Sequence, residues 1–164
     1  MRKPTLLIAA AALLGSASAA LAAPPSVSVA VGPELQRKAE KTYGVREIQA
    51  LAADLQAAVT RAAARARALD DSRVELVLTD AKPNHPTFKQ MSDTPGLSLS
   101  SFGLGGATIE GRVMRPDGSV TPVNYRWYEN DIRWARGRAT WTDAENTIDQ
   151  FAHRLARGEQ VARR

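Results

Sequence analysis

The chain has 164 residues, with 22 basic and 17 acidic side chains and no cysteine. The absence of cysteine excludes disulfides, thiolate metal sites and a lipid-modified cysteine at a cleavage site. The excess of basic residues is small and spread along the chain, whereas nucleic-acid binding requires a concentrated basic face. We therefore do not expect nucleic acid as a partner.

The N-terminus has the three parts of a secretory signal peptide. Arg2 and Lys3 precede an unbroken apolar stretch from Leu6 to Leu14, and small residues follow. The sequence Ala20-Leu21-Ala22 places small residues where a signal peptidase reads them, so cleavage between Ala22 and Ala23 is predicted. A retained transmembrane anchor is the alternative, but nine apolar residues fall short of the about 20 that a membrane span requires.

Removal of residues 1–22 leaves 20 basic and 17 acidic residues, a net charge of +3 over 142 residues. A chain of this length can form one core without disulfides. We expect a single α+β domain over residues 23–158 and a frayed tail over residues 159–164. The mature protein is predicted to be soluble and to lie in a bacterial periplasm or outside the cell.

The first half of the mature chain predicts a strand, a helix and a second strand. Residues 26–31 alternate with period two, which is typical of a half-buried strand. Gly32-Pro33 opens a helical region that is interrupted near Tyr43-Gly44 and then resumes. Residues 73–79 form the next strand, so a crossover between parallel strands is predicted. The apolar face of the helix contains Val45, Ile48, Leu51, Leu55, Val59, Ala62, Ala66 and Leu69.

A hairpin is predicted where Pro116-Asp117-Gly118 separates two alternating runs. A three-residue loop brings Ile109 opposite Tyr125 on one apolar face, whereas a two-residue loop would place Ile109 opposite Arg126. We therefore predict the three-residue loop, with Gly118 in the left-handed conformation. The polar face of the sheet is expected to carry Arg73, Glu75, Thr108, Glu110, Arg112, Asn124 and Arg126.

The C-terminal part predicts a second helix. Thr142 and Glu145 have the spacing of a capping box, and Gly158 is expected to end the helix. Together the elements predict a two-layer α+β sandwich in the order β-α-β-β-β-α. Its mixed sheet has about four strands, with both helices on one face.

The segment from Asp80 to Gly106 has 27 residues without predicted regular structure, which exceeds the roughly 12–15 residues at which loops become unusual. Pro83 and Pro86 stiffen its first part. Residues 97–100 alternate weakly, so part of the segment is predicted to be an edge strand. We interpret the rest as a stiff surface loop and as the best place to look for a partner.

His85 is the histidine of greatest interest, because Pro86 confines it to an extended geometry. A general base needs a partner that orients it, and only Asp80 is near in sequence. We interpret His85 as a turn residue, with a catalytic or ligand-binding role as the alternative. His153 is expected at the surface of the second helix.

Known catalytic and metal-binding patterns are missing from the sequence. It has no H-x-x-x-H pair, no EF-hand-like acidic loop and no G-x-S-x-G or S-x-x-K motif. No metal and no cofactor are therefore expected.

Trp134 lies among Arg133, Arg136 and Arg138. We expect Trp134 to cover one end of the core while the arginines are solvated. The alternative is a basic-aromatic loop that binds an anionic glycan, a peptide carboxylate or a lipid head group.

The leading hypothesis is an exported, non-catalytic binding or envelope-accessory protein, whose partner is an envelope protein or an anionic glycan or peptide. One alternative is a small periplasmic hydrolase that uses Asp80 and His85, with Glu129 as a further candidate. Another is a structural oligomer that associates through the edge or the polar face of its sheet. The candidate binding residues are Asp80, Lys82, Asn84, His85, Phe88, Arg133, Trp134 and Arg136.

Overall fold

The computed structural model describes residues 23–66 and 69–159. The predicted signal peptide and residues 160–164 of the predicted tail lie outside the described residues. Within those two described ranges, no helix has the length and apolar character needed to cross a membrane.

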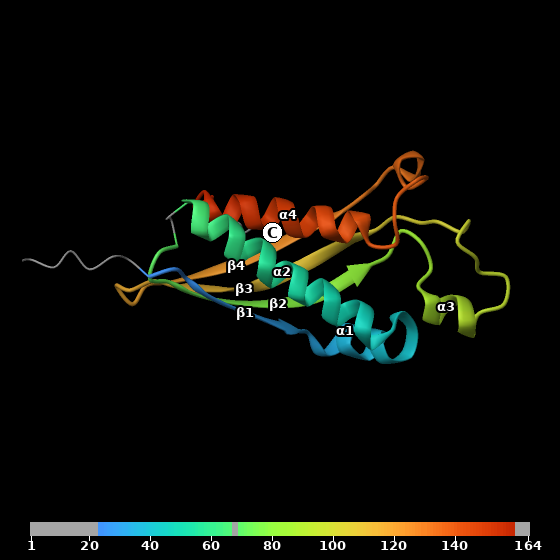
Figure 1. Cartoon of the computed structure of the whole chain (residues 1–164), viewed down its shortest axis with the longest axis horizontal. Helices are drawn as coiled ribbons and strands as arrows, with labels where there is room; N and C mark the ends of the chain where they lie inside the picture. The colour runs from blue at the N-terminus through green and yellow to red at the C-terminus, as the bar shows by residue number, and fades with distance from the viewer. Residues whose placement is uncertain (1–22, 67–68, 160–164) are drawn as a thin grey trace, which may run out of the picture.

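The described part contains two long helices, several short helical segments and one sheet (Figure 1). The segments are β1 Ser26–Val31, α1 Pro33–Lys38, the π-helical turn η1 Ala39–Tyr43, α2 Val45–Ala66, β2 Arg73–Lys82, α3 Phe88–Asp93, β3 Gly106–Met114, β4 Val120–Tyr128, the 3₁₀ turn η2 Ile132–Trp134 and α4 Thr142–Ala156.

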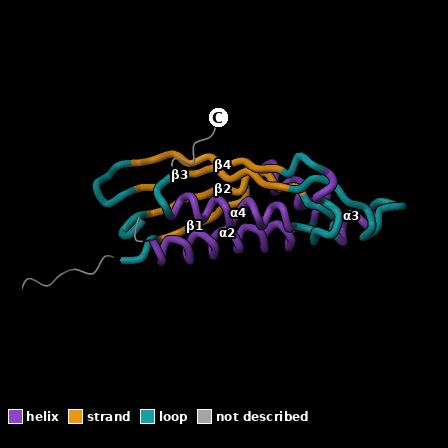
Figure 2. Tube along the Cα trace, turned by 90° about the horizontal axis from the view of Figure 1, so that it is seen from above, coloured by secondary structure: helices purple, strands orange, loops and turns teal. Residues whose placement is uncertain are grey.

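The four strands form one mixed sheet in the order β1-β2-β3-β4. β1 runs parallel to β2, and the other two pairs are antiparallel. The long helices α2 and α4 lie side by side over one face of the sheet (Figure 1). This arrangement confirms the predicted two-layer α+β fold. The molecule is elongated, with the β3–β4 turn at one end and α3 at the other (Figures 1 and 2).

The core fills the space between the sheet and the two long helices. Val74, Leu76 and Leu78 alternate along β2 and all point into this layer, where they are buried. The buried side chains of the helices include Ile48, Leu51, Leu55, Val59, Ile148, Phe151 and Leu155. Each large aliphatic or aromatic side chain buried in this way contributes about 1.5–3 kcal/mol. The predicted apolar face of α2 is thus confirmed from Ile48 to Ala62, whereas Val45 is half-buried and Ala66 is exposed. The helix was predicted to continue to Leu69, but α2 ends at Ala66, and Leu69 is buried in the turn that follows.

The hairpin has the predicted register. Arg115 N–H donates to the Ser119 carbonyl oxygen at 2.9 Å, and Gly118 has a φ of +81° in the three-residue loop. Ile109 lies opposite Tyr125. The opposite face of the sheet, which has no helix over it in the described part, carries the predicted polar residues and is called the open face below (Figure 1).

The predicted edge strand at residues 97–100 is wrong. The segment forms a turn in which Ser101 N–H donates to the Ser98 carbonyl oxygen at 2.9 Å. The Ser98 hydroxyl also accepts from the Ser100 backbone N–H at 3.3 Å. Serine side chains can satisfy nearby backbone groups in this way, and these local bonds compete with strand pairing.

The predicted capping box at Thr142 and Glu145 is also wrong. Trp141 occupies the N-cap position, so Thr142 is already the first residue of α4. Its hydroxyl accepts from the backbone N–H of Ala139 at 2.8 Å, on the preceding loop. A capping box does occur at α3, where Thr87 and Gln90 exchange side-chain to backbone hydrogen bonds at 3.3 and 3.1 Å.

Candidate functional site

A β-bulge turns Asp80 onto the open face of the sheet. Between Leu78 and Asp80 the register of β2 against β3 shifts by one residue, so that Asp80 lies opposite Thr108. Thr108 in turn lies opposite Arg126 on β4, and both side chains belong to the open face. Bulges are frequent next to functional sites because they redirect a side chain. Without the extra residue, Asp80 would point toward the core.

Asp80 joins a chain of polar contacts across the sheet. Lys38 Nζ from α1 donates to Asp80 Oδ1 at 2.6 Å. The Tyr128 hydroxyl from β4 donates to Asp80 Oδ2 at 2.7 Å and lies 3.1 Å from Thr108 Oγ1. The two carboxylate oxygens of Asp80 are therefore engaged by groups from two different parts of the chain, α1 and β4.

The protonation states within this group follow from its contacts. Burial raises the pKa of Asp80, but hydrogen bonds from Lys38 and Tyr128 outweigh burial and hold it below its usual value. The hydrogen bond to Asp80 raises the pKa of Lys38, against the effect of burial. Burial, followed by the hydrogen bond to Asp80, raises the pKa of Tyr128. At neutral pH Asp80 is thus ionised, Lys38 is charged and Tyr128 keeps its proton.

Two more cations flank Tyr128. Lys82 Nζ lies 5.4 Å and Arg126 Cζ 5.2 Å from the centroid of its ring, within the range of cation–π attraction. Both side chains are exposed. Because Asp80 is already held by Lys38 and Tyr128, this group stabilises the end of the sheet and presents positive charge to solvent. It has no group poised to take up a proton near neutral pH.

Asn84, predicted as a binding residue, is instead buried, with 1% of its surface exposed. Its Nδ2 donates to Asp143 Oδ2 at 2.5 Å, and its Oδ1 accepts from the Asp143 backbone N–H at 3.0 Å. Its own backbone N–H donates to the Thr140 carbonyl oxygen at 2.7 Å. Gly103 N–H donates to the Asn84 carbonyl oxygen at 2.7 Å. Asn84 therefore ties together three segments and is not accessible to a ligand.

His85 is half-buried beside Asn84. Its Nδ1 lies 2.8 Å from the Ser101 carbonyl oxygen, which fixes the tautomer with a proton on Nδ1. No hydrogen bond joins His85 to Asp80 within the part of the chain that the structure describes. A small hollow of about 210 Å³ lies between His85, Phe102 and Leu97.

The large exposed apolar side chains gather at one end of the molecule. In the described ranges these side chains are Phe88, Leu99, Phe102, Leu104, Val120, Ile132 and Trp134. All except Val120 come from α3, the loop that follows it, and η2, which lie toward the end opposite the β3–β4 turn, with η2 near the start of α4 and α3 on the other side of that end (Figure 1). We call these six residues, without Val120, the apolar loop end.

The expectation that Trp134 covers the core is wrong, because the residue is 64% exposed. The neighbouring Ala135 is fully buried instead. The single 3₁₀ turn of η2 directs Ala135 inward and therefore leaves Trp134 outward. Arg133 and Arg136 are exposed as expected, and Arg133 forms an ion pair with Asp131 at 2.5 Å. Phe88, the first residue of α3, is 76% exposed.

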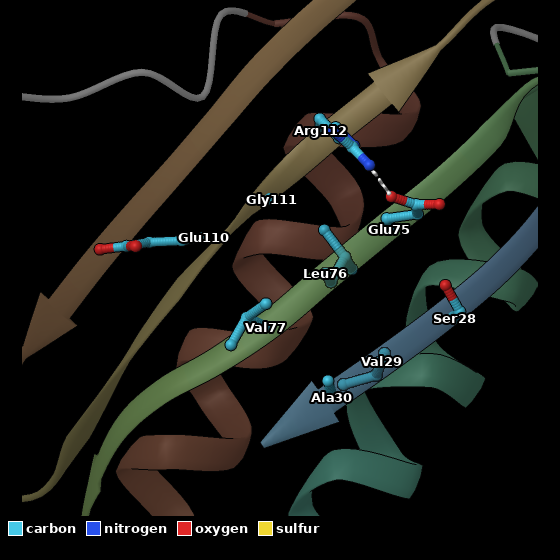
Figure 3. Close-up of a pocket in the computed structure, with 9 residues that line it drawn as sticks. All are labelled: Ser28, Val29, Ala30, Glu75, Leu76, Val77, Glu110, Gly111 and Arg112. Atoms are coloured by element: carbon cyan, nitrogen blue, oxygen red, sulfur yellow. Dashed lines mark hydrogen bonds and ion pairs between the residues drawn. The ribbon is translucent and has the colours of Figure 1, made fainter. Parts of the chain in front are cut away.

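The open face has a shallow hollow of about 600 Å³ beside β1 (Figure 3). Arg112 and Glu75 form an ion pair at 2.7 Å on its rim, and Arg73 contacts the other oxygen of Glu75 at 2.8 Å. The hydrogen bond from Arg112 lowers the pKa of Glu75. The floor is formed by small or short side chains, Ser28, Ala30 and Val77 among them (Figure 3). Opposite charges already neutralise one another here, which gives the hollow no preference for an ion of either sign.

Within residues 23–66 and 69–159, no three acidic or histidine side chains lie close enough together to hold a metal ion.

The sequence analysis missed the residues that contact the predicted ones. These are Lys38 and Tyr128, which contact Asp80, and Asp143, which contacts Asn84. The threonine-x-x-glutamine spacing at Thr87 is the one local signal that could have revealed part of this region.

Comparisons with known proteins give no further assignment. No protein-family model matches the chain, and no curated protein has significant similarity to it.

Proposed function

We propose that this protein is an exported, non-catalytic binding module of the bacterial envelope, which binds its partner through the apolar loop end. The observation that carries the proposal is the exposure of six large apolar side chains on α3, the loop that follows it and η2, at one end of the molecule. A single exposed apolar residue is normal at a protein surface, whereas six large ones on neighbouring segments at one end of a small protein are a reason to place an interaction there, even where they do not form one contiguous patch.

Two further observations support binding rather than catalysis. Asp80 is held by Lys38 and Tyr128, and His85 by the Ser101 carbonyl oxygen, so each has a structural partner. The segment that connects β2 to β3 is anchored through Asn84, which is buried. Rigid anchoring of a loop lowers the entropy cost of binding, because fewer conformations are lost.

Export is tested by cell fractionation and mass measurement. The full-length gene product is expressed in a Gram-negative host, and the mass of the protein in the periplasm and medium is determined. We expect a product that begins at Ala23. A full-length protein confined to the cytoplasm would contradict the proposal.

Binding through the apolar loop end is tested by capture from an envelope extract, with the Leu99→Ser/Trp134→Ser variant compared with wild type. The matched control is Val120→Ser, which removes an exposed apolar side chain at the opposite end of the molecule. Since all three residues are exposed, each substitution is expected to change stability by no more than about 0.5 kcal/mol. Loss of captured material with the double variant alone is the expected result, and identical capture by all three proteins would remove the loop end from consideration.

A further inference from the structure

The composition of the apolar loop end is that of a surface that contacts lipid. It combines two phenylalanines, two leucines, an isoleucine and a tryptophan. Tryptophan is enriched at the membrane–water interface, where its ring lies at head-group depth, and phenylalanine and leucine insert more deeply.

The protein holds these side chains outward on a rigid support. Asn84 and Asp143 fix the base of the loop, and Gly105 N–H adds a hydrogen bond to Asp143 Oδ2 at 3.3 Å. The capping box of Thr87 fixes the first turn of α3, and the burial of Ala135 fixes the end of η2. These contacts fix the backbone at the base of the loop, at the start of α3 and at η2, the segments from which the apolar side chains project.

Positive charge accompanies the tryptophan. Residues 132–138, IRWARGR, contain three arginines and no acidic residue. Arg133 pairs with Asp131, and Arg138 Nε lies 3.6 Å from Asp143 Oδ1. Arg136 is exposed and forms no ion pair within the described residues, which leaves its guanidinium available for a phosphate. This charge complements an anionic head group next to Trp134.

The shape of the loop end favours a bilayer over a protein partner. Its apolar side chains come from three projecting segments, and polar residues such as Ser98, Ser100 and Asp131 lie between them in the sequence. The hollow beside His85, about 210 Å³, is small for a ligand-binding pocket. A protein interface requires a contiguous, complementary patch. A bilayer adapts to separate projecting side chains and requires no such complementarity.

We propose that the apolar loop end binds peripherally to the surface of a membrane that contains anionic phospholipid. Trp134 and its apolar neighbours enter the interface, and Arg136 contacts lipid phosphate. The inference rests on the proposed function, since an exported protein meets such a surface in the cell envelope. Apolar insertion supplies most of the affinity, because Arg136 alone among the three arginines of residues 132–138 forms no ion pair with the described residues.

The test uses the protein purified after export and two kinds of vesicle. One contains phosphatidylethanolamine with phosphatidylglycerol, and the other contains phosphatidylcholine alone. Binding is measured by co-sedimentation and by tryptophan fluorescence. Trp134 is the most exposed of the three tryptophans, since Trp127 is half-buried and Trp141 buried, so it dominates any change of emission. We expect binding to the anionic vesicles, a shift of emission to shorter wavelength, and quenching by lipids with brominated acyl chains.

Substitutions assign the effect to individual residues. Trp134→Ser is expected to weaken binding about tenfold and to abolish the shift of emission. Arg136→Gln is expected to weaken binding to the anionic vesicles by roughly twofold to tenfold at low salt and to have no effect at high salt. Val120→Ser is the matched control and should bind like wild type. Circular dichroism of each variant checks that the fold is intact.

Several results would overturn the proposal: no binding of wild type to either vesicle, equal binding to both, or equal weakening by Trp134→Ser and Val120→Ser. Failure here is distinguishable from failure of the proposed function. Suppose that the wild-type protein does not bind vesicles, and that the Leu99→Ser/Trp134→Ser variant no longer captures an envelope protein that wild type captures. The protein is then still an exported binding module, but its partner is a protein rather than a lipid surface.

Discussion

Asn84 and Asp143, 59 residues apart in the sequence, form two hydrogen bonds in the interior of the protein. One joins their side chains, and the other joins the Asn84 side chain to the first turn of α4. Both residues are buried, with 1% and 0% of their surfaces exposed. The pair connects the start of the long loop after β2 to the start of the last helix, and so it positions the apolar loop end relative to the sheet.

Replacement of Asn84 by alanine is expected to lower the free energy of unfolding by about 3 kcal/mol, because the buried carboxylate of Asp143 loses a donor. Denaturant unfolding of wild type and variant measures the difference. Asn130→Ala is the matched control, since Asn130 is an exposed loop residue. A loss of stability no larger than that of the control would show that the interior contact does not hold the loop.

Arg138 is expected to supply the counter-charge for Asp143. Its Nε lies 3.6 Å from Asp143 Oδ1, which is longer than a hydrogen bond, and Oδ1 accepts no hydrogen bond within the described residues. Arg138→Gln should lower the free energy of unfolding by about 1–2 kcal/mol, since a buried carboxylate then loses its nearest cation. Arg136→Gln, on the same loop but exposed, should change it by less than about 0.5 kcal/mol. Thermal unfolding of both variants tests this, and equal effects would contradict it.

Much of the fold could be predicted because its signals are local and periodic. The alternation along β1 and β2 and the helical spacing of apolar residues in α2 each specify one buried face. The hairpin register could be predicted by comparing two loop lengths, because one pairs Ile109 with Tyr125 and the other pairs it with Arg126. The predictions were wrong where one local sequence pattern is compatible with two structures. Thr142 has the spacing of an N-cap, but α4 begins at Thr142 itself, with Trp141 at the cap position.

The candidate site could be predicted only in part, because its contacts are long-range. Prolines marked the loop, and the cluster of arginines marked η2, but no local signal linked Asn84 to Asp143. The bulge that turns Asp80 outward depends on pairing between β2 and β3. The exposure of Trp134 likewise depends on Ala135 filling the interior position. Propensity and periodicity do not specify such choices.

The contribution of Asp80 and Lys38 to stability is expected to depend on pH. The folded-state pKa of Asp80 is lowered, so its contribution is present above the ordinary value near 4 and is lost as pH falls through the folded value. The pKa of Lys38 is raised, so its contribution is present below the ordinary value and is lost as pH rises through the folded value.

Asp80→Asn should therefore lower the free energy of unfolding by about 1 kcal/mol at pH 7, a modest value because Lys38 is 43% exposed and solvent screens the pair. The difference from wild type should shrink below about pH 4. Denaturant unfolding across this range tests it, with Asp54→Asn, on the exposed side of α2, as the control. A difference that stays constant with pH would show that the charge of Asp80 does not contribute.

Close approach of β2 and β3 depends on Gly111. A Cβ atom at this position would lie 2.2 Å from the Glu75 carbonyl oxygen and 2.9 Å from Leu76 Cα. Both are backbone atoms in the centre of the sheet, so a side chain can be accommodated only if the strands move apart. Gly111→Ala is expected to cost about 3 kcal/mol or more, as overpacking combined with weakened strand pairing. Gly103→Ala is the matched control, because a Cβ atom there meets no other atom within 4 Å. Hydrogen exchange should show faster exchange in β2 and β3 of the Gly111 variant alone, and unchanged protection would mean that the sheet tolerates the side chain without separating.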